Sequence, residues 1–316
     1  VAQIFVVSLM MALFGRLFYL QIADGPRYQE AALDIQSRDI VTPALRGLIV
    51  DMEGEPLATN KAGLMVTADR SILDQQPDKG RSILFRVSEV LNLDSNDVYA
   101  RTRLCGELQK SERIGCWTGN RYQPIPITKE ATEGQVLRIL ERSDLYPGIG
   151  AEPVSIRYYP AKSGERATHV LGYIGPVTEA DLNNEEGKRY YRNELIGKAG
   201  IEYQYDKFLR GTPEIKTVIV NYKESVTRES RNTEPIAGNH LVLNINAKLQ
   251  NAAEEALQNA VQRARGSGYR GDSGAAIVMD LEGRVMAMAS YPDYDLNIWE
   301  NGITVKQAKE LYSQQS

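Results

Sequence analysis

The first 22 residues form an almost uninterrupted apolar run. Gln3 and Ser8 are the only polar side chains before Arg16. A helix needs about 20 apolar residues to cross a bilayer, and no small-residue cleavage site of a signal peptide follows the run. A buried core helix is the alternative, but no amphipathic stripe is visible. We therefore expect residues 1–23 to form a transmembrane anchor, with residues 1–22 in contact with the lipid bilayer.

Alternating apolar and polar positions predict two β-hairpins with the same kind of turn. The first hairpin covers residues 46–58 and the second covers residues 273–290. In each, an Asp stands at the first turn position and a Gly follows three residues later, as in Asp51 with Gly54 and Asp280 with Gly283. Asp favours the first position of a type I turn, and Gly accepts a positive φ. We interpret this as shared turn chemistry and not as a repeat, because nothing periodic lies between the two hairpins.

Apolar residues at helical spacing predict several helices. They cover residues 83–91, residues 128–140 with a Thr start, a segment beginning at Thr178, and a long helix capped by Asn246. The long helix follows a predicted strand at 241–245 and carries a narrow Ala-rich stripe suited to close packing on a sheet. The members of the stripe are Leu249, Ala252, Ala253, Ala256, Leu257, Ala260, Val261 and Ala264.

Composition and charge narrow the class of protein. The chain has 316 residues, 37 Lys and Arg against 41 Asp and Glu, and a net charge of −4. Its composition is that of a globular protein, and its length exceeds what one hydrophobic core usually covers, so we expect two soluble domains. No dense basic stripe is present, so we expect no nucleic-acid partner. Residues 222–235 are charged and poor in large apolar side chains, which indicates an exposed ribbon or linker.

The two cysteines, Cys105 and Cys116, bracket a short polar stretch. No His or third Cys lies nearby, so the spacing fits no zinc site. Two free thiols are the alternative, but a pair around a hairpin-sized loop, after a membrane anchor, favours a disulfide. A disulfide needs an oxidising compartment. We therefore expect a single-pass protein of the cell membrane with its bulk on the extracytoplasmic side.

The other chemistry-bearing residues give weak signals. His169 and His240 are isolated, so we expect no metal and no cofactor, and we interpret His169 as a hydrogen-bonded structural residue. The Gly-rich segment 266–271 precedes a strand, so it indicates a loop and not a phosphate cradle. We expect the neighbouring carboxylates of Glu254 and Glu255 on an exposed helix face.

Several segments together resemble a known family, the class B penicillin-binding proteins. The residues that carry the resemblance are Arg46, Gly47, Asp51 and Gly54 in the first segment, Arg157 and Pro160 in the second, and Gly200, Glu202 and Gly211 in the third. The helix and hairpin of residues 247–290, with their continuation to Asn297, resemble the opening of the family's transpeptidase domain. Each segment alone is a weak signal, but the set occurs in the right order behind an anchor. The sequences of the third segment and of the helix and hairpin are most similar to those of the elongation-type members.

The resemblance implies an α+β fold in three parts. These are a transmembrane anchor over residues 1–23, an elongated mixed α/β pedestal (dimerisation) domain over residues 24–237, and the beginning of a transpeptidase domain over residues 238–316. The last part is expected to combine an antiparallel sheet with helices. The resemblance also implies peptidoglycan D,D-transpeptidation in cell-wall synthesis. In the family, a Ser activated by a Lys three residues later attacks the D-Ala-D-Ala carbonyl, and β-lactams acylate the same Ser.

The sequence departs from the family pattern at the catalytic motif. No Ser in the 316 residues is followed by a Lys three positions later. Lys162-Ser163-Gly164 and Ser230-Arg231-Asn232 spell the other two family triplets, but both precede the transpeptidase opening, so we interpret them as chance matches. Met52 stands where the family usually carries Arg. We therefore expect a catalytically silent chain, truncated inside a helix-like segment at 305–312, and we name no catalytic residue.

Two classes of function follow from these observations. In the first, the chain belongs to a cross-linking transpeptidase whose acyl-serine chemistry resides in a missing carboxyl-terminal part, with peptidoglycan stem peptides and β-lactams as ligands. In the second, it is a non-catalytic, membrane-anchored module that binds a membrane-embedded glycan polymerase. An unrelated anchored substrate-binding protein is a less favoured third class.

The motif residues themselves have two open interpretations. Arg46, Asp51 and Glu202 are expected either to pin the pedestal to the catalytic domain or to satisfy buried backbone groups. The motif glycines are expected to permit turns.

Overall fold

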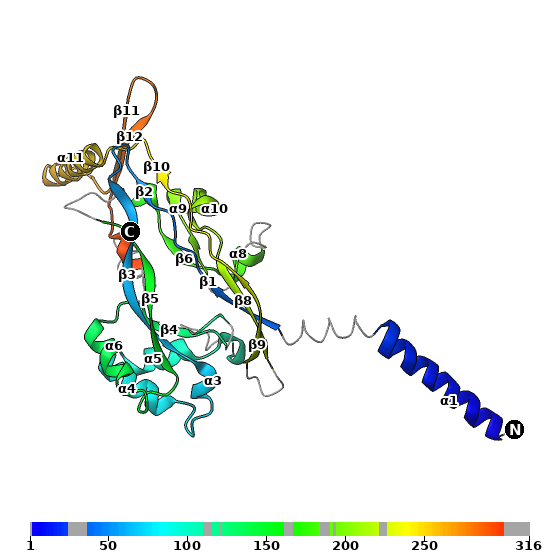
Figure 1. Cartoon of the computed structure of the whole chain (residues 1–316). Coiled ribbons are helices and arrows are strands. Elements are labelled where there is room, and N and C mark those ends of the chain that lie inside the picture. Colours follow the sequence, from blue (N-terminus) through cyan, green and yellow to red (C-terminus); the bar gives the residue numbers. More distant parts are fainter. Residues whose placement is uncertain are drawn as a thin grey trace. The chain divides into compact units, whose positions relative to one another are not determined.

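The computed structural model describes residues 2–24, 37–109, 116–119, 122–160, 167–183, 190–191, 194–220 and 226–299 (Figure 1). The chain divides into two compact units. The first unit combines Val1–Ile40 with Ile215–Thr233, and the second combines Val41–Glu214 with Glu234–Ser316. The domain boundaries at residues 23 and 237 stay a prediction, because this division follows the packing of the chain and not its motifs.

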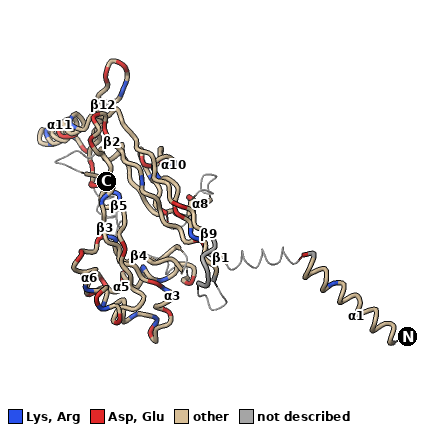
Figure 2. The backbone as a smooth tube through the Cα atoms, viewed as in Figure 1, with Lys and Arg blue, Asp and Glu red and all other residues tan. Residues whose placement is uncertain are grey.

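The first unit begins with an apolar helix. Helix α1 (Ala2–Phe18) continues as a π-helical turn over Tyr19–Ala23. Within it, Gln3–Ile22 has a mean hydropathy of 1.8 and is long and apolar enough to cross a membrane. Figure 2 shows this helix almost without charged residues, and Arg16 is the basic residue of its last turn. The helix is therefore a candidate membrane span by length and composition.

The first unit also contains a three-stranded sheet. Its strands are β1 (Ser37–Thr42), β8 (Glu214–Val220) and β9 (Val226–Thr233), in the order β1-β8-β9. Strands β8 and β9 are antiparallel. Of the two interpretations of residues 222–235, ribbon and linker, the described residues favour the ribbon, because 226–233 form a strand paired with β8. The backbone hydrogen bonds of such a strand do not depend on apolar side chains.

The second unit is built around a five-stranded sheet. Its strands are β2 (Ile49–Val50), β3 (Pro56–Ala68), β4 (Ile125–Thr128), β5 (Ile149–Tyr158) and β10 (Leu241–Val242). The order is β10-β2-β3-β4, with β5 also paired to β3. Only β10 and β2 run parallel, and the ladder between β3 and β5 extends from Thr59 opposite Tyr158 to Ala68 opposite Ile149. The long strand β3 pairs with both β2 and β5, and therefore joins the first motif segment and Arg157 of the second segment in one sheet.

Both predicted hairpin turns are confirmed. In the first, Asp51 Oδ1 accepts hydrogen bonds from the backbone N–H groups of Glu53 and Glu55, each at 2.8 Å. In the second, which joins β11 (Gly274–Met279) and β12 (Val285–Tyr291), Asp280 accepts the equivalent bonds. A carboxylate that binds the backbone N–H groups two and four residues later closes such a turn without help from the rest of the fold, which explains why the sequence pattern predicts it.

Four helices cover one end of the five-stranded sheet. They are α3 (Arg70–Leu73), α4 (Arg81–Leu91), α5 (Ser95–Thr102) and α6 (Glu133–Leu140). Their core consists mainly of Val66, Ala68, Leu73, Ile83, Leu84, Val87, Ile127 and Ile139. The predicted start of α6 at Thr128 is wrong, because Thr128 ends β4. The N-cap is Thr132, which forms a capping box with Gln135.

A second core lies around Ile49, at the other end of the sheet. It consists mainly of Ile49, Leu57, Ala58, Tyr159, Leu171, Leu209, Ile245 and Leu296. Among the short elements, α7 (Thr168–Leu171), α9 (Gly200–Gln204), α10 (Asp206–Leu209) and the 3-10 turn Leu296–Trp299 contribute residues to this core. Between α7 and α9 the chain forms β6 (Ile174–Pro176), α8 (Glu179–Asn183) and β7 (Leu195–Gly197). The predicted helix start at Thr178 is confirmed, since Thr178 and Asp181 exchange capping hydrogen bonds.

Helix α11 (Ala247–Gly266) packs on the β11–β12 hairpin, and Asn246 caps it as predicted. Its first turns also reach the backbone of β12. The N–H of Asn246 donates to the carbonyl of Met286 at 2.9 Å. The buried amide of Gln250 donates to the carbonyl of Met288 at 2.9 Å and accepts from its N–H at 2.8 Å. The side chain of Gln250 thus binds Met288 as a neighbouring strand would.

The Ala-rich stripe of α11 is only half covered. Ala253, Leu257, Val261 and Ala264 are buried or half-buried, but Ala252, Ala256 and Ala260 are exposed. The expectation of a fully packed stripe is therefore wrong for the described residues, because a two-stranded hairpin covers only one side of the helix.

Candidate functional site

Three motif segments meet at one buried carboxylate. Arg46 precedes β2, Arg157 lies on β5, and Glu202 lies on α9, so chain folding brings together residues that are far apart in sequence. The exposed fraction is 9% for Arg46, 5% for Arg157 and zero for Glu202. Charged groups are almost never buried to this extent unless they are paired. The three residues, with Asp206 and Tyr159, are referred to below as the charge cluster.

Each oxygen of Glu202 binds a different arginine. Oε2 lies 2.7 Å from Nη2 of Arg46, and Oε1 lies 2.7 Å from Nε of Arg157. The hydroxyl of Tyr159 donates to Oε1 at 3.2 Å. Arg46 Nη2 also lies 2.8 Å from Oδ1 of Asp206, the neighbouring carboxylate. Two cations and two anions therefore compensate each other inside the fold, which is the condition for burying such groups.

The charge cluster also holds backbone atoms of the motifs. Arg157 Nη1 donates to the carbonyl of Gly47 at 2.8 Å, and the N–H of Gly197 donates to Asp206 Oδ1 at 2.8 Å. Arg46 Nη2 donates to the carbonyl of Glu202 at 3.2 Å. Hydrogen bonds that involve a charged partner are stronger than neutral ones. The cluster therefore fixes the backbone of the first and third segments as well as their side chains.

Burial and charge shift the titration of this region. Burial alone would lower the pKa of Arg46, but the charges of Glu202 and Asp206 outweigh it, so the pKa is raised. Burial, followed by the charge of Glu202, raises the pKa of the Tyr159 hydroxyl far above its ordinary value. Arg46 is thus held as a cation and Tyr159 as a neutral hydrogen-bond donor.

A second ion pair extends the cluster. Arg210 Nη1 lies 2.7 Å from Oε2 of Glu194, and Arg210 Nε lies 3.5 Å from Oδ2 of Asp206. Burial raises the pKa of Glu194, although the N–H of Tyr191 and the charge of Arg210 oppose this shift. The net direction means that desolvation outweighs the ion pair at this carboxylate.

The motif glycines serve two different needs. Gly54, Gly200 and Gly211 have φ of +91°, +58° and +72°, as expected for residues that permit turns. Gly47 has no positive φ, so the expectation that it permits a turn is not confirmed at this glycine. A Cβ at Gly47 would overlap the backbone carbonyl of Asn239, so this position needs Gly because two backbones approach closely.

Asp51 links the first hairpin to helix α11. While Oδ1 closes the turn, Oδ2 accepts a hydrogen bond from the N–H of Ala247 at 3.0 Å, at the first residue of α11. The N–H of Met52 donates to the carbonyl of Ile245 at 3.0 Å. The carboxylate of Asp51 thus satisfies backbone N–H groups and joins residues 46–58 to the segment after 238. That this contact pins a pedestal domain to a catalytic domain stays a prediction.

The remaining candidates lie apart from the charge cluster. Cys105 and Cys116 form a disulfide with their Cα atoms 5.2 Å apart. Pro160 is half-buried at the end of the described segment 122–160, and Lys162-Ser163-Gly164 lies outside the described residues. Asn232 of the second triplet lies on β9.

The structure also brings Asp206, Tyr159 and Arg210 to the site, and the sequence alone does not name them as site residues. Asp206 and Tyr159 bind Arg46 and Glu202, respectively, which are distant in sequence. Arg210 lies four residues after Asp206, a spacing that is common on any helix. The expectation that Glu254 lies on an exposed helix face is wrong. Its Oε1 accepts hydrogen bonds from the N–H of Ala167 at 2.9 Å and from Gln250 Nε2 at 2.8 Å. It is therefore half-buried and bonded instead of merely solvated.

The arrangement is suited to holding segments in place. Both oxygens of Glu202 and Oδ1 of Asp206 accept hydrogen bonds from arginines. Among the residues that the structure describes, no group of three His, Cys, Asp or Glu could hold a metal ion. The described contacts of the cluster join the backbone and side chains of the three motif segments.

Comparisons with known proteins place the charge cluster within a family domain. Residues 41–243 match the family described as the Penicillin-binding Protein dimerisation domain. The chain is 29% identical over 316 residues to the peptidoglycan D,D-transpeptidase MrdA of Escherichia coli K12, covering 98% of this chain and 45% of that protein. It is 30% identical over 319 residues to MrdA of Haemophilus influenzae, covering 98% of this chain and 44% of that protein.

Solved structures show the same fold. The penicillin-binding protein PBP2 of Helicobacter pylori, in complex with MreC, aligns with a TM-score of 0.62 at 24% identity, over 87% of this chain and 46% of that one. A structure described as the structural coordination of polymerization and crosslinking by a peptidoglycan synthase complex aligns with a TM-score of 0.54 at 25% identity, over 100% of this chain and 49% of that one.

The chain spans less than half the length of the curated relatives that it matches. The domain match nevertheless covers most of the chain, and the motif residues Arg46, Arg157 and Glu202 all lie inside it. The expected combination of sheets and helices is likewise present, with mostly antiparallel strand pairs, and it follows an apolar helix in the sequence. The chain belongs to the family of penicillin-binding proteins that carry this dimerisation domain, and it is similar over nearly its whole length to MrdA.

Proposed function

We propose that this chain acts in peptidoglycan cross-linking, as the anchored and pedestal-bearing part of a D,D-transpeptidase. The observation that carries the proposal is the charge cluster, which joins all three motif segments within the matched dimerisation domain. We assign residues 1–23 to the anchor, 24–237 to the pedestal, and 238–316 to the beginning of the transpeptidase domain. In this assignment Asp51 connects the pedestal to the first helix of the transpeptidase domain.

The acyl-serine chemistry is proposed to lie outside these 316 residues. No Ser in the sequence has a Lys three positions later. The curated relatives are about twice as long as the matched part. Stem peptides and β-lactams are therefore ligands of the longer protein, and the present chain positions the domain that would bind them.

We propose that α1 anchors the chain in the cell membrane, with the bulk of the protein on the extracytoplasmic side. Two features support this topology. Gln3–Ile22 is apolar over the length of a bilayer, and the Cys105–Cys116 disulfide fits an oxidising compartment.

A fluorescent penicillin tests the catalytic assignment. The 316-residue chain is incubated with the probe beside the same polypeptide extended through its natural downstream sequence. We expect a covalent label only on the extended polypeptide, and the label is expected to disappear after prior treatment with unlabelled penicillin. Labelling of the 316-residue chain would contradict the assignment, and mapping the labelled peptide would then identify the nucleophile, with Ser163 as the first residue to examine.

A second candidate function is a non-catalytic module that binds a membrane-embedded glycan polymerase. The observation in its favour is the alignment of the entire chain, apolar helix included, with the synthase complex that couples polymerization to crosslinking. Co-purification of the chain with its polymerase in detergent, with and without residues 1–24, tests this candidate. Retention of polymerase by the full chain and higher glycan output would support it, and unchanged output would reject it.

A further inference from the structure

An amide side chain clamps the backbone of Tyr159. Oδ1 of Asn297 accepts a hydrogen bond from the N–H of Tyr159 at 3.0 Å, and Nδ2 of Asn297 donates to the carbonyl of Tyr159 at 3.0 Å. Both backbone groups of Tyr159 are therefore bound by one side chain that lies 138 residues further along the chain. Such a reciprocal pair reproduces the hydrogen bonding of a neighbouring strand.

The amide of Asn297 is held in the orientation that the clamp needs. Oδ1 of Asp295 accepts hydrogen bonds from both the N–H and the Nδ2 of Asn297, each at 2.9 Å. One proton of Nδ2 thus faces a carboxylate and the other faces the carbonyl of Tyr159. A flipped amide would place an oxygen against both acceptors, so this environment fixes which end of the side chain points where.

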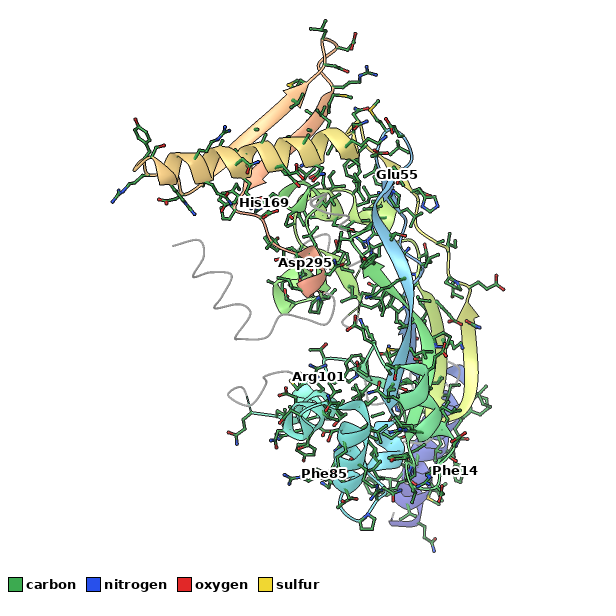
Figure 3. The ribbon with its side chains drawn as sticks, turned by 90° about the vertical axis from the view of Figure 1, so that its left-hand side faces the viewer. Phe14, Glu55, Phe85, Arg101, His169 and Asp295 are labelled. Atoms are coloured by element: carbon green, nitrogen blue, oxygen red, sulfur yellow. A yellow bond between two sulfur atoms is a disulfide. The ribbon has the colours of Figure 1, made fainter. Side chains whose placement is uncertain are left out.

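Further contacts join the same two segments. Thr168 Oγ1 donates to the carbonyl of Tyr294 at 3.0 Å, and His169 Nε2 lies 3.0 Å from the carbonyl of Pro292. The ring of His169 meets that of Tyr294 edge to face, with centroids 5.7 Å apart. Figure 3 labels His169 and Asp295 on the two segments. Residues 292–297 are therefore attached to Tyr159, Thr168 and His169 at several points.

Tyr159 is the residue that these contacts share with the charge cluster. Its hydroxyl donates to Oε1 of Glu202, the oxygen that also binds Arg157, while its backbone is held by Asn297. The side chain of Tyr159 is buried in the core around Ile49, so it has no free space in which to move independently. Glu202, Tyr159 and Asn297 are thus joined by one continuous series of hydrogen bonds.

We propose that Tyr159 and Asn297 form a mechanical coupling that transmits the state of the charge cluster to residues 292–299. Asn297 is the positioning residue of this device, and Tyr159 is its connecting element. The segment leads from the β11–β12 hairpin toward the end of the described chain, so the coupling links the pedestal motifs to the opening of the proposed transpeptidase domain. It goes beyond the proposed function, because it concerns how the two parts communicate and not what reaction follows.

Hydrogen exchange on the full chain in detergent tests the coupling. Tyr159→Phe removes the hydroxyl bond to Glu202 but leaves the backbone groups that Asn297 binds. We expect the amides of Tyr159, Asn297 and Ile298 to exchange about fivefold faster, the effect of one lost hydrogen bond of typical net strength. The amides of the β3–β5 ladder report whether the fold is intact. For the variant Asn297→Asp described below, the matched control is Asn259→Asp, the same change on the exposed face of α11.

A double variant separates coupling from two independent losses. Asn297→Asp removes the Nδ2 donor and sets a carboxylate against the carbonyl of Tyr159, so it opens the clamp. In this background Tyr159→Phe is expected to cause no further acceleration at Asn297 and Ile298. If the two substitutions accelerate exchange at Asn297 and Ile298 independently, so that their fold-changes multiply in the double variant, the proposal is overturned. If Asn297→Asp prevents folding, the single Tyr159→Phe variant decides, because unchanged exchange at Asn297 and Ile298 would equally overturn it.

Discussion

Oε1 of Glu202 lies 2.7 Å from Nε of Arg157, and both side chains are almost completely removed from solvent. Removing one partner of a buried ion pair leaves the other charge uncompensated, which typically costs about 3–5 kcal/mol. We therefore expect Glu202→Gln to lower the free energy of unfolding by about this amount. Urea unfolding of the detergent-solubilised chain, followed by circular dichroism, measures the change.

The control for this substitution is Glu255→Gln, the same chemical change on the exposed face of α11. We expect it to alter the free energy of unfolding by less than about 0.5 kcal/mol. A loss below about 1 kcal/mol for Glu202→Gln would show that the arginines find other partners and that the charge cluster does not hold the motifs together.

Gly47→Ala tests the close approach of two backbones. The added Cβ meets the carbonyl of Asn239, and backbone cannot turn aside as a flexible side chain can. We expect a loss of about 1–3 kcal/mol, the usual cost of overpacking. Gly134→Ala is the matched control, because a Cβ there meets nothing within 4 Å. Equal stability of the two variants in urea would contradict the prediction.

The raised pKa of Glu194 predicts how its contribution to stability depends on pH. The folded state binds the proton of this carboxyl more tightly than the unfolded state, whose ordinary value is 4.5. The stability that the protonated group contributes is therefore complete below pH 4.5 and decreases as pH rises through the folded-state pKa. We expect the stability of the wild-type chain relative to Glu194→Gln to fall as pH rises from 4.5, in urea unfolding at successive pH values. A relative stability that increases with pH would mean that the Arg210 ion pair dominates.

The disulfide predicts a local loss of order on reduction. It closes a loop between residues 11 apart in sequence, beside the hydrogen bond from the N–H of Cys105 to the carbonyl of Trp117. We expect Cys105→Ser combined with Cys116→Ser to lower the free energy of unfolding by about 2–4 kcal/mol. The fluorescence of Trp117 is expected to shift before global unfolding, with Trp299→Phe removing the other tryptophan signal. A reducing agent should reproduce the double variant in the wild-type chain and should leave the double variant unchanged.

Local signals in the sequence predicted the turns and caps well. The carboxylates of Asp51 and Asp280 close their turns with N–H groups two and four residues later. Asn246 caps α11 by accepting a hydrogen bond from the N–H of Leu249, three residues later. Such bonds depend on neighbours in the chain, so the sequence pattern contains them. The misplaced start of α6 is a local error too, because Gln135 stands three residues after Thr132 and completes a capping box there.

Long-range partners could not be predicted in the same way. Arg46 and Glu202 are 156 residues apart, and Tyr159 and Asn297 are 138 residues apart. The neighbours of Arg46, Glu202 and Asn297 in the sequence do not indicate burial. Charged and amide side chains are usually exposed, and their burial can be inferred only when the distant partner is known. The motif resemblance identified Arg46 and Glu202 as important, but their pairing depends on how β5 and α9 pack. The burial of Gln250 was missed for the same reason, because its partner is the backbone of a distant strand.

The contacts of Gln250 and Asn246 with β12 determine on which side the two-stranded β11–β12 sheet can accept a further strand. They occupy the carbonyl of Met286 and both backbone groups of Met288, so a further strand cannot pair with β12 at these residues. An unpaired strand edge is a template for another strand. Within the described part of the chain, β11 pairs only with β12. Any strand that extends this sheet must therefore add beside β11, and the hairpin gives the sheet a single direction of growth.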